Sequence, residues 1–328
     1  MALVNQDENP PLCLLSGASG MLGTALRLAL AARGTPVVRL VRTPGRAGAP
    51  AEGEVVWSPG AESPLASASA LAGCRAAVHL SGANVGAHRW TAAYKREIAE
   101  SRVASTRALA RALDGLKQPP ECLIVASAVG FYGDRGDEVL DETSPAGTGF
   151  LAEVCRQWEE AARPAIDAGI RVVHLRLGVV LGPCGGALEQ MLPAFRLGLG
   201  GPLGNGRQWM SWISLEDAVR AILFALEPPA PEAPALAGPV NLTAPQPVTN
   251  AGFTRLLAAH LHRPAVFRAP AFALRLAFGQ MADETLLASA RVLPARLTAA
   301  GFRFSHPSVD RALAYALGTA PVRSAALS

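Results

Sequence analysis

The chain has 328 residues, half of them hydrophobic, and its formal net charge is +4 with an isoelectric point of about 9.0. This length allows one large or two moderate domains with a sizeable core. The basic residues are scattered rather than clustered, so the charge does not indicate a nucleic-acid partner. No apolar run is long enough to predict a membrane span.

The cysteines exclude two further classes. There are five, an odd number without a C-x-x-C pair, so we expect neither a disulfide framework nor a zinc site. Cys13 and Cys122 lie in apolar runs and are expected to be small core residues. Residues 1–11 are polar and acidic, unlike a signal peptide. These features predict a cytoplasmic protein without a membrane partner.

Short apolar runs alternate with helical stretches through the first two thirds of the chain. This alternation predicts an α/β protein, with a parallel sheet covered by helices on both faces. The expected strands are 12–15, 37–41, 55–57, 77–80, 123–126 and 172–177. The expected helices are 21–33, 90–116, 150–168 and 215–225.

The pattern changes after residue 182, where glycine and proline become frequent up to Trp212. We expect a loop-and-helix excursion there, followed by a short strand at 240–242. Thr249 or Asn250 is expected to cap a helix that continues to His260, and the rest is expected to be helical, ending with 308–317. The predicted domains are a dinucleotide-binding domain (11–182 and 212–245) and a smaller substrate domain (183–211 and 246–320).

Three glycines follow the first expected strand at a G-x-x-G-x-x-G spacing: Gly17, Gly20 and Gly23. A strand, a glycine turn and a helix place a diphosphate at the helix N-terminus, where exposed N–H groups and the helix dipole attract an anion. Gly17 permits the tight turn, Gly20 leaves room for the phosphates, and Gly23 allows close packing of the helix. The spacing therefore predicts a dinucleotide site.

Longer motifs add a resemblance to a known family. They are SGASGMLG at 16–23, HLSGAN at 79–84, SAVGFYG at 127–133, RLGVVLG at 176–182, FRLGLGGP at 195–202 and AGFRF at 300–304. The chain resembles the extended short-chain dehydrogenases/reductases, and within them the atypical "epimerase family" subgroup that has a C-terminal domain of its own. The resemblance implies a Rossmann-type sheet, a smaller substrate domain and a cofactor contact at the segment after the fourth strand.

The second strand favours NADP(H) over NAD(H). An NAD site places an acid at the end of this strand, whereas here the chain continues with Arg42 and Thr43, and no acid precedes Glu52. Arg42 can pair with a 2′-phosphate, unless it is simply a solvated surface residue. The expected cofactor site comprises Gly17, Ser19, Gly20, Met21, Leu22, Gly23, Arg42, Thr43, Leu80, Ser81, Gly82, Ala83, Arg102 and Ser127.

The proton-relay residues implied by the resemblance are absent by type. The family's Tyr and Lys, spaced Y-x-x-x-K, align with Leu151 and Cys155, and its Asn on the preceding helix aligns with Arg102. Arg102 can supply the lost positive charge. Substitute catalytic groups are Ser127 and Tyr132, next to the end of the fifth strand, although each has an equally simple structural interpretation.

Other residues are weaker candidates. Arg89 and Lys95 flank the long helix, where they face either an anionic ligand or solvent. Gln208, Trp209, Met210 and Trp212 follow the glycine-rich excursion. The two tryptophans form either an apolar clamp over the substrate or part of the core.

These features predict an NADP(H)-dependent oxidoreductase or epimerase-like enzyme that acts on an unidentified small molecule, with hydride transfer supported mainly by positioning and electrostatics. The alternative is a non-catalytic NADP(H)-binding regulator or scaffold. Some relatives of the resembled subgroup are labelled cell-division inhibitors, which suits this alternative and a link to cell division. A nucleotide-sugar epimerase is a third option, which the missing tyrosine argues against. The protein is expected to be a monomer or a homodimer. The resemblance to extended reductases implies that a dimer would form through helices 90–116 and 150–168.

Overall fold

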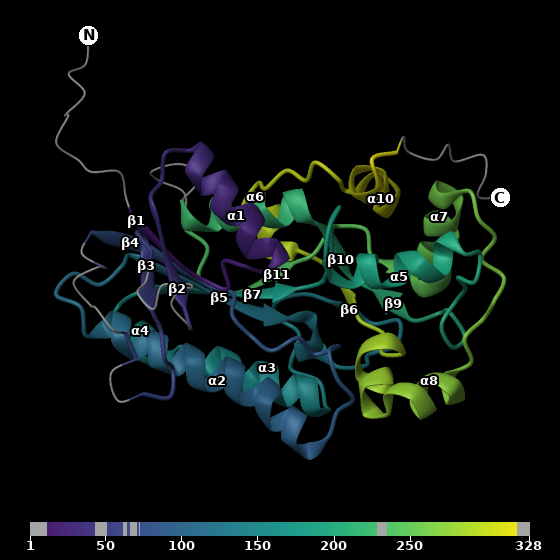
Figure 1. Cartoon of the computed structure of the whole chain (residues 1–328), viewed down its shortest axis with the longest axis horizontal. Coiled ribbons are helices and arrows are strands. Elements are labelled where there is room, and N and C mark those ends of the chain that lie inside the picture. Colours follow the sequence, from purple (N-terminus) through teal and green to yellow (C-terminus); the bar gives the residue numbers. More distant parts are fainter. Residues whose placement is uncertain are drawn as a thin grey trace, which may run out of the picture.

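A single parallel sheet of seven strands forms the centre of the molecule (Figure 1). The computed structural model describes residues 12–42, 51–61, 64–65, 71, 73–227 and 235–319. The strand order is β11-β7-β5-β4-β1-β2-β3, which confirms the expected α/β Rossmann-type class. The strands are β1 (Leu12–Ser16), β2 (Val37–Val41), β3 (Glu54–Val56), β4 (Cys74–His79), β5 (Cys122–Ala128), β7 (Arg171–Leu177) and β11 (Gly238–Leu242).

Helices cover both faces of the sheet, because these strands are apolar on both sides. One face packs against α1 (Met21–Ala32) and α6 (Leu215–Leu226), where Leu26 and Ile222 join Leu15 and Ile124 in one cluster. The other face packs against α2 (Ala92–Asp114), α3 (Phe150–Glu160) and α4 (Arg163–Asp167). Figure 1 shows the two helical layers above and below the sheet. Cys13 and Cys122 lie in this core, as expected.

The long helix is close to its prediction, and the next one is not. Thr91 caps α2, its hydroxyl accepting from the Tyr94 N–H, and Gly115 ends the helix. The single helix expected over 150–168 is wrong, because α3 ends at Glu160 and α4 begins at Arg163. Pro164 lies in the first turn of α4. A proline there lacks the N–H that would continue α3 and clashes with the preceding turn, so the helix breaks.

The two ends of the glycine-rich excursion lie side by side in a small sheet of their own. Parallel strands β8 (Val179–Leu181) and β10 (Trp212–Ser214) hold its two ends together, and α5 (Gly186–Arg196) and β9 (Trp209–Met210) lie between them. Leu188, Leu192 and Phe195 of α5 pack against residues of α7 and α10 in a separate apolar cluster. The excursion is therefore anchored by its own core.

The C-terminal part is mostly helical, as expected. It contains α7 (Asn250–Leu261), α8 (Ala271–Phe278), the π-helical turn η3 (Ala282–Leu286), α9 (Ala295–Ala299) and α10 (Val309–Leu317). Thr249 caps α7, its hydroxyl accepting from the Gly252 N–H. Two short strands in this part were not expected: β12 (Val248–Thr249) pairs with β9, and β13 (Arg291–Val292) pairs with β6 (Val139–Leu140). The strands β6, β8, β9 and β10 earlier in the chain were not expected either. The two-domain division remains a prediction. Within the described ranges, no helix is long and apolar enough to cross a membrane.

Candidate active site

The order of the strands places the candidate cofactor site between β1 and β4. This is the topological switch point of the sheet: β2 and β3 are added on one side of β1, and β4 and the later strands on the other. Open parallel sheets bind ligands beyond the carboxyl ends of the strands at such a point. Gly17 follows β1 with φ of +70°, a left-handed conformation that favours glycine. A Cβ on Gly17 would lie 2.8 Å from the Leu80 carbonyl carbon. The glycine turn and the segment after β4 therefore touch, as the sequence predicts for one binding site.

The first turn of α1 is open where a phosphate would lie. Gly20 is its N-cap, no side chain caps the helix, and no acidic residue lies in its first turn. A Cβ on Gly20 would have only the Gly17 carbonyl oxygen in reach, at 3.5 Å, whereas one on Gly23 would lie 2.1 Å from that same oxygen. Gly23 thus permits the helix to pack against the turn itself. Ser19 and Gly20 are exposed, and Met21 and Leu22 are half-buried.

Arg42 follows β2 directly and its side chain is exposed. Among the residues that the structure describes, no carboxylate lies within ion-pair distance of Arg42, whereas Arg39 pairs with Glu54 at 2.8 Å. The guanidinium of Arg42 is therefore available to an anionic ligand. Thr43 lies outside the described residues.

His79, the last residue of β4, joins this strand to β1 and α2 through hydrogen bonds. Its side chain is fully buried, with Nδ1 2.6 Å from the Ser16 Oγ and Nε2 3.1 Å from the Ser105 Oγ. Ser105 donates to the Ser101 carbonyl oxygen, so it accepts from Nε2–H, and Nδ1 accepts from Ser16. Burial lowers the pKa of His79 to about 4, which keeps the ring neutral. His79 is therefore a structural histidine.

Arg102 brings a positive charge to this loop from α2. Its guanidinium donates to the Ala83 carbonyl oxygen at 3.0 Å and to the Ile98 carbonyl oxygen at 3.1 Å. It lies 5.0 Å from the Trp158 ring centroid, and a Cβ on Gly82 would lie 3.2 Å from its Cζ. No carboxylate of the described residues pairs with it, although it is half-buried. A half-buried cation with only neutral partners is suited to an anionic or hydroxyl-bearing ligand.

The helix that follows β5 presents no proton donor at the two aligned positions. A Cβ on Gly130 would lie 3.3 Å from the Leu151 Cβ and 4.0 Å from the Cys155 Sγ, so both side chains face the end of β5. Cys155 is buried, and this burial raises the pKa of its thiol to about 11. At neutral pH the thiol carries no charge, so neither residue reproduces a tyrosine–lysine pair.

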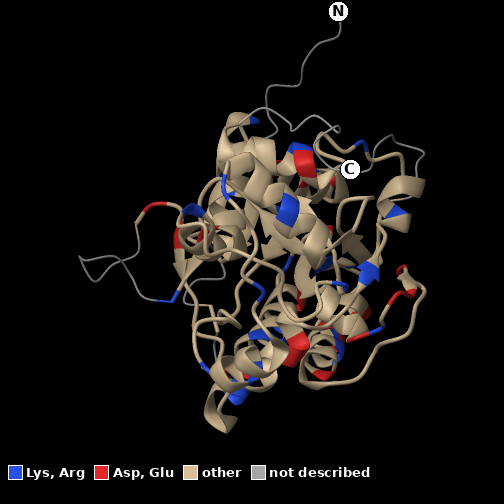
Figure 2. Ribbon diagram, turned by 90° about the vertical axis from the view of Figure 1, so that its right-hand side faces the viewer, with Lys and Arg blue, Asp and Glu red and all other residues tan. Residues whose placement is uncertain are grey.

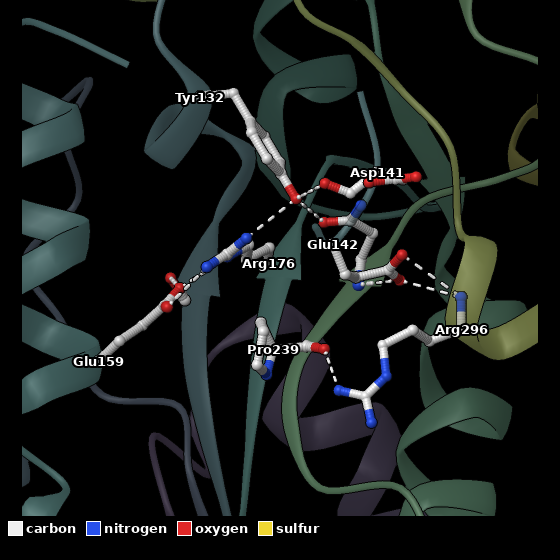
Figure 3. A network of polar contacts seen from close by, with 9 residues as sticks. Tyr132, Asp141, Glu142, Glu159, Arg176, Pro239 and Arg296 are labelled. Atoms are coloured by element: carbon white, nitrogen blue, oxygen red, sulfur yellow. Dashed lines mark hydrogen bonds and ion pairs between the residues drawn. The ribbon is translucent and has the colours of Figure 1, made fainter. Parts of the chain in front are cut away.

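A buried polar network joins the ends of β5 and β7 (Figure 3). Ser127 donates to Glu159 Oε1 at 2.8 Å, and Arg176 pairs with the same carboxylate through two contacts of 2.8 and 2.9 Å. Arg176 also donates to the Tyr132 hydroxyl at 3.0 Å, and that hydroxyl lies 2.7 Å from Asn241 Oδ1. The charges are therefore compensated within the protein.

This network decides how two candidate catalytic groups are placed. Tyr132 is fully buried, and its hydroxyl is held by Arg176, Asn241 and the Asp141 carbonyl oxygen. Ser127 is also buried, and its hydrogen bond goes to Glu159. These contacts favour the structural interpretation of Tyr132. The Ser127 hydroxyl, at the end of β5, can still accept a hydrogen bond, but its proton is already donated to Glu159.

The C-terminal segment contributes a group that sequence reasoning missed. The Glu284 carboxylate of η3 accepts from the N–H groups of Phe150 (3.0 Å) and Leu151 (2.7 Å) and so caps α3. Gln280 donates to Glu284 at 2.6 Å, and Lys95 donates to Gln280. Lys95 is thus engaged with protein groups. No local motif signals Glu284, because its partners are more than a hundred residues away in the chain.

The two tryptophans do not form a clamp, and of the two alternatives the core interpretation holds for Trp212 alone. Trp212 is fully buried in the cluster of α5, α7 and α10, because its strand β10 belongs to the core. Trp209 instead donates to Asp137 at 2.8 Å and stacks with Arg291, whose Cζ lies 4.3 Å from the ring centroid. Gln208 donates to the carbonyl oxygens of Leu203 and Leu286 and holds the excursion to η3.

Comparison with known proteins assigns the chain to a family. A sequence model of the NAD dependent epimerase/dehydratase family matches residues 13–236, which include the glycine turn, Arg102 and the helix after β5. The chain belongs to the NAD dependent epimerase/dehydratase family. A second model, a domain of unknown function named DUF1731, matches residues 269–316. The resemblance inferred from the motifs is therefore confirmed.

Relatives of this epimerase family member extend over nearly its whole length. An epimerase family protein of Mycobacterium bovis is 47% identical over 92% of this chain and 96% of its own. The crystal structure of the human epimerase family protein SDR39U1 (isoform 2) with NADPH is 35% identical, with a TM-score of 0.83 over 94% of this chain and 100% of that one. A nucleoside-diphosphate sugar epimerase of Corynebacterium glutamicum is 36% identical, with a TM-score of 0.74 over 97% of this chain and 60% of that one.

Proposed function

We propose that the protein binds NADP(H) at the glycine turn and acts as an oxidoreductase or epimerase-like enzyme on an unidentified small molecule. One observation carries this proposal: the first turn of α1 is uncapped and open at Gly20, next to the segment after β4. Free N–H groups at such a turn bind a diphosphate. Gly20 leaves room for such a group, since a Cβ there would have only the Gly17 carbonyl oxygen within reach.

Arg42 supports NADP(H) rather than NAD(H). It stands at the end of β2 with its guanidinium exposed, in the place where an NAD site has an acid. The NADPH in the structure of the human relative is consistent with this choice. A bidentate contact from Arg42 to a 2′-phosphate provides the selectivity.

The chemistry depends on charge and position more than on proton transfer. When bound, the nicotinamide supplies or accepts a hydride. Arg102 holds a positive charge beside Gly82 and Ala83, where it stabilises negative charge that develops on a substrate. Leu151 and the neutral Cys155 thiol lie beside Gly130 at the end of β5 and add no charge there. A substrate that carries its own proton donor, or a bound water, completes the reaction.

A second function is a non-catalytic NADP(H)-binding regulator. The observation that favours it is the chemistry of α3, since Leu151 cannot donate a proton and the Cys155 thiol, with a pKa of about 11, stays neutral. The cofactor cradle is retained although this pair is lost. A nucleotide-dependent change in affinity for a partner protein would then replace turnover.

The experiment is a calorimetric titration of the purified protein with NADPH and NADH, for the wild type and for Arg42→Asp. We expect NADPH-selective binding by the wild type and a larger loss for NADPH than for NADH in the variant. Arg111→Asp, on the exposed end of α2, is the control for the same charge change. Equal losses for both nucleotides would remove Arg42 from the phosphate site, and no binding of either would overturn the proposal.

Turnover separates the two functions. The protein is incubated with NADPH deuterated at nicotinamide C4 and a panel of carbonyl compounds and nucleotide sugars, and the products are analysed by mass spectrometry. Transfer of deuterium that depends on Arg102 supports the enzyme. Tight NADPH binding without transfer to any compound supports the regulator.

A further inference from the structure

One end of the molecule carries large apolar side chains in water. Six of them are between 56% and 76% exposed: Leu197, Leu199, Val266, Phe267, Phe272 and Leu276. They come from the turn after α5, the connection between α7 and α8, and α8 itself. Scattered exposed apolar residues are ordinary, but a gathered group of this kind marks an interaction surface.

Backbone contacts bring these segments together into one face. The Ala269 N–H donates to the Pro202 carbonyl oxygen at 3.0 Å, and the Gly204 N–H donates to the Ala269 carbonyl oxygen at 2.8 Å. Arg263 Nε donates to the Arg196 carbonyl oxygen at 2.9 Å. Helix α8 begins directly after this pairing, at Ala271. We call the surface formed by 196–204 and 263–278 the apolar–basic face.

The charged residues of the apolar–basic face have one sign. The sequence contains no Asp or Glu from 190 to 215 or from 233 to 282, whereas Arg196, Arg263, Arg268 and Arg275 lie on the face. All four are exposed. Arg275 pairs with Asp283 at 2.8 Å, and of the described residues no other carboxylate pairs with any of the four. Figure 2 views this end of the molecule, with arginines in blue.

Neutral polar side chains are almost missing from the same surface. Residues 196–204 and 264–278 contain only arginine, glycine, proline, alanine and larger apolar residues. A specific protein interface carries about one hydrogen bond per 100–200 Å², made largely by polar side chains. A bilayer surface requires only apolar groups that enter the acyl boundary and cations that meet anionic headgroups. The composition therefore favours a lipid surface over a protein partner.

A second copy of the chain is a poor occupant. A two-fold contact would place the arginines of one copy against those of the other, and like charges brought together in this way oppose association. We infer that the apolar–basic face docks on the surface of an anionic lipid membrane, with Phe272 and Leu276 entering the headgroup boundary and Arg196 and Arg268 contacting phosphates. This contact is peripheral, so it needs no membrane-spanning helix, and the described residues contain none.

The test is sedimentation of the full-length protein with vesicles of phosphatidylcholine, with and without phosphatidylglycerol. We expect binding to the anionic vesicles that weakens as salt is raised. Arg196→Gln/Arg268→Gln should weaken it about 30-fold, since each cation near an anionic surface contributes roughly a factor of five. Phe272→Ser/Leu276→Ser should weaken it by at least about the same factor. All four side chains are exposed, so both variants should fold.

Matched controls lie elsewhere on the surface. Leu28→Ser/Ile166→Ser removes two exposed apolar side chains from α1 and α4, and Arg107→Gln/Arg111→Gln removes two exposed charges from α2. Both controls should bind vesicles like the wild type. Three results would overturn the inference. The first is no binding to anionic vesicles at low salt, and the second is an equal loss of vesicle affinity in the control variants. The third is normal vesicle binding by the variants of the apolar–basic face. Self-association that Leu276→Ser abolishes, without vesicle binding, would assign the face to a second copy instead.

Discussion

The Glu284 carboxylate accepts the backbone N–H of Leu151 at 2.7 Å, so a residue of the C-terminal segment caps the helix that carries the positions expected for catalysis. Its other oxygen accepts the Phe150 N–H at 3.0 Å. The N-cap of α3 is Gly149, whose φ is +110° and which has no side chain of its own to satisfy these donors. A carboxylate at a helix N-terminus also interacts favourably with the helix dipole.

Replacement of Glu284 should therefore loosen the contact between η3 and α3. We expect Glu284→Ala to lower the free energy of unfolding by about 1–2 kcal/mol, the usual cost of a lost cap. Asp283→Ala is the matched control, because its exposed ion pair with Arg275 should contribute less than about 1 kcal/mol. Urea denaturation measures both. Equal effects for the two substitutions would show that the cap contributes no more than a surface ion pair.

Substitutions of Gly20 and Gly23 should affect NADPH affinity and stability differently. The Cβ of Gly20→Val meets only the Gly17 carbonyl oxygen, at an ordinary contact distance of 3.5 Å, so the protein should fold normally and lose NADPH binding by steric exclusion. Gly23→Ala places a Cβ 2.1 Å from the Gly17 carbonyl oxygen and should cost about 1–3 kcal/mol of stability. Gly60→Ala, with no atom within 4 Å of the added Cβ, is the neutral control. Unchanged NADPH affinity in Gly20→Val would contradict the diphosphate assignment.

Arg102 should matter for binding and little for stability. Arg102→Met keeps an apolar stem against Trp158 and removes a half-buried charge that has no carboxylate partner within the described part of the chain. We expect the free energy of unfolding to change by less than about 1 kcal/mol, and NADPH affinity to fall about tenfold or more through the lost charge-assisted contact. Calorimetry and denaturation of the same sample give both values. A variant that is strongly destabilised but binds normally would make Arg102 structural.

His79 should make stability depend on pH. Its folded-state pKa is lowered from 6.5 to about 4 by burial, so below pH 6.5 the unfolded chain takes up a proton that the native protein does not. Stability is therefore complete above pH 6.5 and declines by up to about 3 kcal/mol as the pH falls to 4. His79→Gln keeps a donor and an acceptor for Ser16 and Ser105 without titrating. The free energy of unfolding of both proteins is measured by denaturation at several pH values. An equal decline for the wild type and His79→Gln between pH 6.5 and 4 would contradict the assignment.

Local patterns were sufficient for the sheet and the cofactor cradle. The strand 37–41 agrees with β2 at both ends. Gly17 and Gly20 lie between β1 and α1, and Gly23 lies in the first turn of α1, where the spacing predicts them. These features depend on residues that are close in the chain. A buried parallel strand needs a continuous apolar run, and a phosphate turn needs glycines at fixed intervals.

Contacts between distant residues were not visible in the same way. The sequence left Tyr132 open between a catalytic and a structural role, and the choice depended on Arg176 and Asn241, which reach its hydroxyl from β7 and β11. Trp209 and Trp212 are close in the chain yet separate into a surface contact and the core, because β10 is paired with β8.

The sequence by itself determined the family, the parallel sheet and the absence of a tyrosine–lysine pair at positions 151 and 155, because each depends only on residue type and spacing. Tertiary structure alone decided that Glu284 caps α3, that Arg102 is half-buried with no carboxylate partner among the described residues, and that the segments 196–204 and 263–278 with their exposed apolar residues lie together. Capping, charge pairing and exposure are properties of three-dimensional neighbours, and neighbours more than a hundred residues apart leave no periodic trace in the chain.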